Sequence, residues 1–173
     1  MTAILEKRIY EERLDSFKYA LVLAQKTAEE MLYERIVEAG FIKMKGKLIS
    51  PIKDDFRLVK HFGKCNVGPV ALDNKGVDLE ANIGTNVYPI YEGIVSAIFS
   101  YNGLKNVMIR HGSYISVYCN LDVVYVQVNE KVTSKDTIGV LSENMLHFQL
   151  RHEIEVLNPE EWLDLGISML QND

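Results

Sequence analysis

The chain has 173 residues and a formal net charge of −5, with 47% hydrophobic and 25% charged residues. This length fits one ordinary domain with room for an appendage, and the composition is that of a folded globular protein. The acidic balance, with no Lys/Arg cluster beyond the short "KMKGK" at 43–47, excludes nucleic acid and anionic membranes as expected partners, because both select basic surfaces.

The sequence shows no targeting or membrane-spanning segment. No apolar run approaches the length of about 18 residues that a membrane helix needs, so we expect no membrane span in this chain. The N-terminus "MTAILEKRIYEERLD" is charged from residue 6 onward and lacks the apolar core of a signal peptide. This predicts either a cytoplasmic protein or a mature or truncated piece of an exported one.

Residues 1–41 are predicted to form a helical region. No Gly or Pro occurs between Ile4 and Ala39, and apolar residues recur there at threes, fours and sevens, which predicts one long helix or a helical hairpin with an apolar stripe. The stripe consists of Leu5, Ile9, Leu14, Phe17, Leu21, Ala28, Met31, Leu32 and Ile36. Gly40 is expected to end the helix, because glycine accepts the left-handed conformation found at helix ends.

Residues 42–168 are predicted to form a β domain. Short β-type runs separated by turn residues follow one another here, namely "LVKHF", "NVYPIYEGIVSAIFS", "NVMIRHG", "YISVYCNL", "VVYVQV", "TIGVL" and "MLHFQLRH". The Asn-Gly pair at 102–103 predicts a β-hairpin. Since no helical pattern separates the runs, we expect a β-sandwich or barrel and a mainly β fold.

Three segments of this β region stand out, namely "KGVDLEANIGTNVYPIYEGIVSAI", "NVMIRHGSYISVYCNL" and "LHFQLRHEIEVLNPEEWL". They resemble the lysostaphin-type (LytM) domain, the fold of zinc endopeptidases that cut peptidoglycan cross-links. They occur in the family's order, and the resemblance extends over residues 46–163. It implies a two-sheet β-sandwich of the LytM hybrid type, preceded here by the N-terminal helix.

The resemblance also places the expected catalytic positions, and three of five carry other residues. The aspartate is kept as Asp78, and the second member of a His-x-His pair is kept as His147. The remaining three expected histidines are replaced by Asn74, Asn120 and Met145. We therefore expect a degenerate peptidase site with no catalytic residue, no metal and no cofactor.

The chemistry of these residue types supports the same expectation. A catalytic zinc takes three protein ligands and an open position for water, and an amide is a poor substitute for imidazole. Amide and thioether side chains cannot transfer protons near neutral pH. We expect His147 to be hydrogen-bonded on its strand rather than a ligand, with Asp78 as an acceptor. A residual zinc endopeptidase, the less favoured alternative, would need a further ligand such as His61 or Glu80.

Among members that lack the zinc set, the layout resembles EnvC-like murein hydrolase activators, which combine a helical or coiled-coil region with a LytM domain. The resemblance implies a non-enzymatic protein of the cell envelope or periplasm that binds and activates an N-acetylmuramoyl-L-alanine amidase or another cell-wall hydrolase. The predicted binding groove, with a tyrosine and a methionine as anchors, is lined by Asn74, Asp78, Tyr118, Asn120, Met145 and His147. A structural module that binds peptidoglycan itself stays open as the alternative.

The apolar stripe of the helix has to be covered, because a lone helix exposing it would self-associate or aggregate. Three coverings are open: the β domain, a second copy of the chain, or a partner protein. In a regulator, our first hypothesis is that the helix covers the groove as a built-in inhibitor that a competing partner releases.

The remaining cysteines and histidines are expected to be structural. Cys65 and Cys119 lack any CxxC spacing, and we expect both to be small buried residues, with a disulfide between them unsupported. His61, His111 and His152 are expected at strand ends, without a chemical role.

Overall fold

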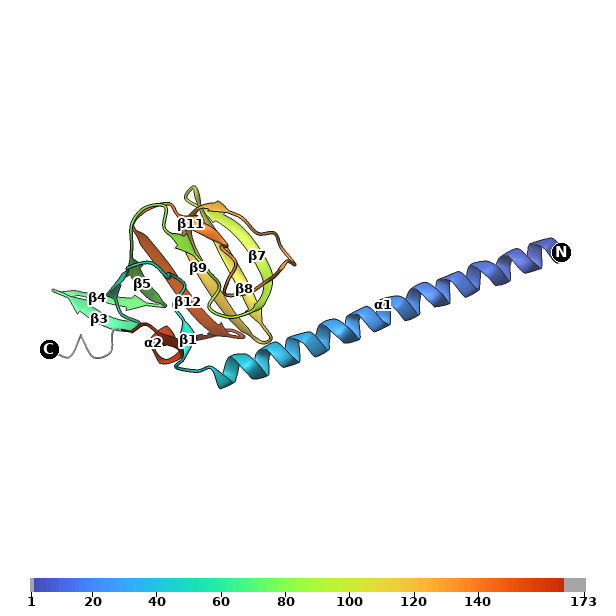
Figure 1. Cartoon of the computed structure of the whole chain (residues 1–173), viewed down its shortest axis with the longest axis horizontal. Helices are drawn as coiled ribbons and strands as arrows, with labels where there is room; N and C mark the ends of the chain where they lie inside the picture. Colours follow the sequence, from blue (N-terminus) through green and yellow to red (C-terminus); the bar gives the residue numbers. More distant parts are fainter. Residues whose placement is uncertain (1, 167–173) are drawn as a thin grey trace. The chain divides into compact units, whose positions relative to one another are not determined.

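The computed structural model describes residues 2–166. The chain divides into two compact units, one ending at Ile36 and the other beginning at Val37. A single helix, α1 (Ala3–Lys43), runs through the first unit and ends in the second (Figure 1). The mainly β fold with an N-terminal helix is confirmed, and the helix is not a hairpin. Within residues 2–166, no helix is both long enough and apolar enough to cross a membrane.

The prediction that Gly40 ends the helix is wrong. Gly40 lies inside α1, and a Cβ there would collide with the hydroxyl of Tyr91, so this glycine permits a close approach. The chain turns after α1 at Gly46, whose φ is +84°. The last turns of α1 belong to the β unit because Val37 and Phe41 are buried in it. The division between the two compact units therefore falls within α1, before Val37.

One large antiparallel sheet forms the centre of the β unit, with the strand order β10-β7-β8-β9-β12-β5-β2. These strands are β2 (Arg57–Lys60), β5 (Val77–Glu80), β7 (Gly93–Tyr101), β8 (Leu104–His111), β9 (Tyr114–Val124), β10 (Lys131–Val132) and β12 (Met145–His152). Three short strands pair outside this path: β6 (Asn86–Val87) with β11 (Gly139–Leu141), β11 also with β9, and β13 (Glu155–Leu157) with β12. The predicted hairpin is confirmed, since Asn102 and Gly103 both have positive φ and join β7 to β8.

Two small sheets complete the unit. β1 (Leu48–Ile49) pairs in parallel with β14 (Leu163–Asp164), next to the short helix α2 (Pro159–Trp162). β3 (Gly63–Val67) and β4 (Val70–Asn74) form a separate hairpin, which the sequence did not predict. None of its residues is buried, so no alternation of apolar and polar residues marks these strands in the sequence.

Strand β12 positions the candidate site through a strict alternation, because successive side chains of a strand point to opposite faces. The buried side chains that enter the core are Leu146, Phe148 and Leu150. The half-buried side chains on the other face are Met145, His147, Gln149 and Arg151. Figure 1 shows β12 between β5 and β9, so residues of three strands converge on the half-buried face.

Candidate functional site

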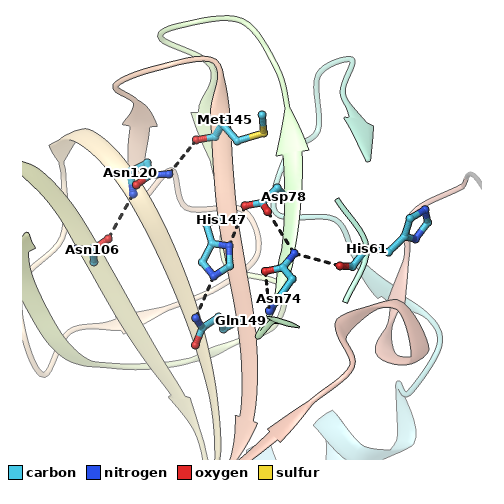
Figure 2. Close-up of polar contacts among 9 residues, drawn as sticks. His61, Asn74, Asp78, Asn106, Asn120, Met145, His147 and Gln149 are labelled. Carbon is cyan, nitrogen blue, oxygen red and sulfur yellow. Dashed lines mark hydrogen bonds and ion pairs between the residues drawn. The ribbon is translucent and has the colours of Figure 1, made fainter. Parts of the chain in front are cut away.

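Asp78 and His147 face each other across two neighbouring strands. They are directly opposed in the β5–β12 pair, and Nδ1 of His147 lies 2.8 Å from Oδ1 of Asp78 (Figure 2). Because an ionised carboxylate only accepts hydrogen bonds, the imidazole donates from Nδ1. The expectations that His147 is hydrogen-bonded and that Asp78 is an acceptor are confirmed.

Asn74 presents its amide hydrogens to the same carboxylate. Its Nδ2 donates to Oδ2 of Asp78 at 3.2 Å and to the carbonyl of His61 at 3.1 Å. Its Oδ1 accepts from the backbone N–H of Gly76 at 3.4 Å. Both oxygens of the aspartate therefore meet donors, and the Asn74 oxygen points to the backbone and not to the site.

A polar chain continues along β12 from the other side of the imidazole. Nε2 of His147 accepts from Nε2 of Gln149 at 2.9 Å. Oε1 of Gln149 in turn accepts from Nε and Nη2 of Arg151, at 3.2 and 2.9 Å. Each side chain in this row is hydrogen-bonded to the next, and such a network holds its side chains in one arrangement. The sequence analysis missed Gln149 and Arg151, although their spacing of two from His147 places them on its face.

Asn120 lies at an irregularity in the backbone of β9. Its φ is +76°, a conformation that Asn tolerates better than most residues, and the pairing of β9 with β8 shifts register here. Its N–H donates to Oδ1 of the buried Asn106 at 3.4 Å, and its Nδ2 donates to the carbonyl of Met145 at 3.5 Å. The side chain thus ties the bulge to β12 (Figure 2).

The prediction that Tyr118 lines an accessible groove is wrong. Its side chain is fully buried, packed edge-on against Phe148. The phenol oxygen accepts from the N–H of Ile90 at 2.9 Å and lies 2.9 Å from the hydroxyl of Ser116. Burial raises the pKa of Tyr118 above its usual value, against the opposing effect of these hydrogen bonds. Tyr118 is a core residue with a satisfied hydroxyl.

Cys119 lies beside His147 and Asp78 in one row across β9, β12 and β5, an order that resembles a cysteine nucleophile with its base and orienting carboxylate. The chemistry opposes that role. Burial, with the nearby charge of Asp78, raises the pKa of Cys119 to about 11, so the reactive thiolate is disfavoured. Nε2 of His147 is also occupied by Gln149.

The other cysteine and three other histidines lie outside this site. Both cysteines are free, and the expectation that Cys65 is buried is wrong because it lies exposed on the β3–β4 hairpin. The placement of the histidines is confirmed: His111 ends β8, His152 ends β12 and His61 follows β2. His61 pairs through Nδ1 with Glu160 at 2.7 Å.

The donor set does not fit a catalytic zinc. A zinc hydrolase site uses three protein ligands, whereas Asp78 and His147 supply two and bond to each other. Asn74 adds no electron pair to them, because its Nδ2 donates to Asp78 and its Oδ1 accepts from the backbone of Gly76. The further ligands considered from the sequence are engaged elsewhere, Glu80 with Arg57 and His61 with Glu160. In the described part of the chain, no three His, Cys, Asp or Glu side chains are grouped to hold a metal.

Comparison with known proteins identifies the family. Residues 73–159, about half of the chain, match the profile of peptidase family M23. The chain therefore belongs to this family, whose members are typically extracytoplasmic, and the resemblance to the LytM-type domain is confirmed.

Individual relatives share the fold over most of the β unit. An "Uncharacterized metalloprotease" of Buchnera aphidicola subsp. Baizongia pistaciae (strain Bp) is 30% identical over an alignment of 122 residues, and the match covers 64% of this chain and 32% of that protein. A chain of the SpoIIQ-SpoIIIAH pore forming complex superposes with a TM-score of 0.58 at 22% identity, covering 74% of this chain and 97% of that one. A zinc containing peptidase from Vibrio cholerae gives 0.58 at 20% identity, covering 64% and 38%. These structural likenesses establish the fold alone.

Proposed function

We propose that this chain is a non-catalytic member of family M23 that acts by binding a protein partner. The observation that supports this is the occupation of the Asp78 carboxylate by donors from His147 and Asn74. Charge-assisted hydrogen bonds stabilise a partly buried carboxylate in the absence of a cation. A hydrolase of this family would need that carboxylate as a metal ligand, and here the neighbouring side chains satisfy it.

The partner that we propose is a peptidoglycan hydrolase of the cell envelope, in first place an N-acetylmuramoyl-L-alanine amidase. The resemblance to EnvC-like activators and the typical location of the family support this choice. The similarity to a chain of the SpoIIQ-SpoIIIAH complex adds a related fold that takes part in a protein assembly. An activator must bind the active state of the hydrolase more tightly than its inactive state.

The contact surface that we propose is the half-buried face of β12 with its neighbours on β4, β5 and β9. It comprises Asn74, Asp78, Asn120, Met145 and His147. Met145 is an adaptable apolar anchor, and the surrounding amides and the aspartate–histidine pair offer orientation-specific polar contacts. Tyr118 is left out of this surface because it is buried.

An activation assay tests the proposal. Purified amidase is incubated with dye-labelled peptidoglycan, with and without this chain, and release of dye is followed. We expect release only with both proteins present, and loss of stimulation with Met145→Glu. The matched control is Ile154→Glu, which adds the same charge at a side chain that is 93% exposed, in the turn between β12 and β13, outside the proposed surface. Equal stimulation by both variants would remove this face as the interface.

Two further measurements separate the alternatives. A pull-down on purified sacculi without any amidase tests the peptidoglycan-binding module, which would sediment with the wall although it stimulates nothing. Dye release by the chain alone that a chelator abolishes would instead establish a residual zinc endopeptidase. Absence of both stimulation and binding across candidate amidases would contradict the proposed partner class.

A further inference from the structure

The first unit carries an apolar seam with the spacing of a coiled coil. Alternating steps of four and three residues define the 10–31 seam: Tyr10, Leu14, Phe17, Leu21, Ala24, Ala28 and Met31. This repeat of 3.5 residues keeps one face of α1 toward a partner helix when two helices supercoil left-handedly. The pattern is sustained without a polar interruption over the full 10–31 seam.

The seam side chains are exposed on the helix. The exposed fractions are 67% for Tyr10, 69% for Phe17 and 70% for Leu21, and Leu14, Met31 and both alanines are exposed as well. A contiguous exposed apolar stripe of this length marks an interaction surface. The question is which partner fits its sizes and charges.

A parallel, in-register second copy does not fit. Each seam residue would face its own copy, so that Phe17 would meet Phe17 while Ala24 and Ala28 would meet alanines and leave poorly filled layers. The flanking positions of a parallel pair are five residues apart on opposite helices. They would join Glu6 to Glu11 and Arg13 to Lys18, which are like charges.

An antiparallel second copy fits both size and charge. With Leu21 opposite Ala24 of the second helix, the same register places Phe17 opposite Ala28 and Leu14 opposite Met31. Large residues then meet alanines in the two central layers, which is how facing side chains interdigitate at native density, and Leu14 meets the adaptable side chain of Met31 in the next layer. Tyr10 falls opposite Arg35, an arrangement that permits a cation–π contact.

The flanking residues agree with this register. They pair Glu11 with Leu32, Lys18 with Gln25 and Ala20 with Thr27, and Arg13 stands near the oppositely charged Glu34. No like-charged pair remains. The arrangement has two-fold symmetry, so every contact is made twice.

We propose that residues 10–35 of α1 pair with the same segment of a second copy in an antiparallel coiled coil. Of the three coverings that the sequence left open, the self-complementary seam favours the second copy over the β domain or another protein. The inference is independent of the proposed activation of a hydrolase.

Sedimentation velocity of the full chain over a range of concentrations tests the pairing. We expect a dimer. Its dissociation constant should rise at least about tenfold with Phe17→Asp, because a charged side chain then replaces an aromatic one in a central layer of the coiled coil. Tyr19→Asp is the matched control: it introduces the same charge two residues away, at a side chain that is 72% exposed and lies on the outer face of the helix. A monomer at every concentration, or equal loss in both variants, would overturn the proposal.

The orientation is tested by exchanging sizes across one layer. Ala28→Phe should weaken the antiparallel dimer, because two phenylalanines would then meet, whereas a parallel dimer would gain apolar contact. Adding Phe17→Ala in the same chain restores a large–small layer and should recover the dimer. As a second measurement, oxidation of a mixture of Leu21→Cys and Ala24→Cys chains should form a disulfide between the two variants. The unsubstituted chain, oxidised in the same way, measures the cross-linking that comes from the native Cys65 and Cys119. Strengthening by Ala28→Phe, or preferential cross-linking of Ala24→Cys with itself, would overturn the antiparallel arrangement.

Discussion

Asn74 donates a hydrogen bond of 3.2 Å to the Asp78 oxygen that His147 leaves unbonded. Asp78 and His147 supply two electron-pair donors, and the neighbouring Asn74 directs hydrogens to this pair instead of a third electron pair. Zinc binding by this site can therefore be tested with a single substitution at position 74.

Replacing Asn74 by His is expected to create zinc binding. The substitution removes the amide hydrogens from the carboxylate and supplies a third ligand of the type that zinc prefers. Elemental analysis after dialysis should give about one zinc per chain for Asn74→His and well below one for the unsubstituted chain. Asn66→His, on the exposed strand β3, is the matched control and should bind no zinc. Stoichiometric zinc in the unsubstituted chain would contradict the conclusion that Asp78, His147 and Asn74 do not form a zinc site.

Much of the β unit could be predicted from sequence, because alternation on β12 and the Asn-Gly turn are local patterns with a direct structural reading. The Asp78–His147 pair followed from the family resemblance. The burial of Tyr118 could not be predicted, since the bulge at Asn120 shifts the register of β9 and a period-two pattern does not reveal such a shift. The prediction that Gly40 ends the helix was wrong because its close approach to Tyr91 is a contact between distant parts of the chain, which a local pattern does not reveal.

Tyr118→Phe is expected to destabilise the β unit. The substitution leaves the buried N–H of Ile90 without its acceptor and removes a partner of the Ser116 hydroxyl. An unsatisfied buried donor costs about 1–3 kcal/mol, and urea unfolding should show a loss of that size. Tyr101→Phe, at a side chain that is 71% exposed, removes the same atom at the surface and should leave the free energy of unfolding nearly unchanged. Equal effects would mean that the Tyr118 hydroxyl contributes no stabilising contact.

Gly76→Ala is expected to disturb the site through the backbone. A Cβ at this position would collide with the carbonyl oxygen of Phe148 on β12, and backbone atoms cannot move aside as a flexible side chain can. The overpacking should cost about 3 kcal/mol or more and displace Asp78, which lies two residues further along the chain in β5. Gly68→Ala provides the comparison, because a Cβ at Gly68 would lie in open space. The φ of +62° at this position then costs an alanine only about 1–2 kcal/mol of conformational strain. Unfolding free energies that rank the two variants in the opposite order would contradict the prediction.

His111 is expected to make the β unit sensitive to acid. Its ring is fully buried and stacked on Phe41 at a centroid distance of 4.7 Å. Nδ1 donates to the carbonyl of Glu92, and Nε2 is hydrogen-bonded to the hydroxyl oxygen of Ser116, both at 2.8 Å. Burial lowers the pKa of His111 from 6.5 to about 4, although the hydrogen bond to Glu92 opposes the shift. The folded chain therefore holds a neutral imidazole across the range in which an unfolded chain takes up a proton.

The sign of the effect follows from proton linkage. Between pH 6.5 and about 4 the unfolded state binds more protons at this residue than the folded state does, so the free energy of unfolding falls as the pH falls through this window. The contribution of the neutral imidazole is fully present above pH 6.5, and the loss at the acid end is roughly 3 kcal/mol for a shift of this size. Urea unfolding at a series of pH values measures it. His111→Gln removes the titrating group, so the variant should show a shallower fall over the same window even where its stability at pH 7 is lower. If both chains lose stability in parallel, the acid sensitivity belongs to other groups and the burial of His111 does not control it.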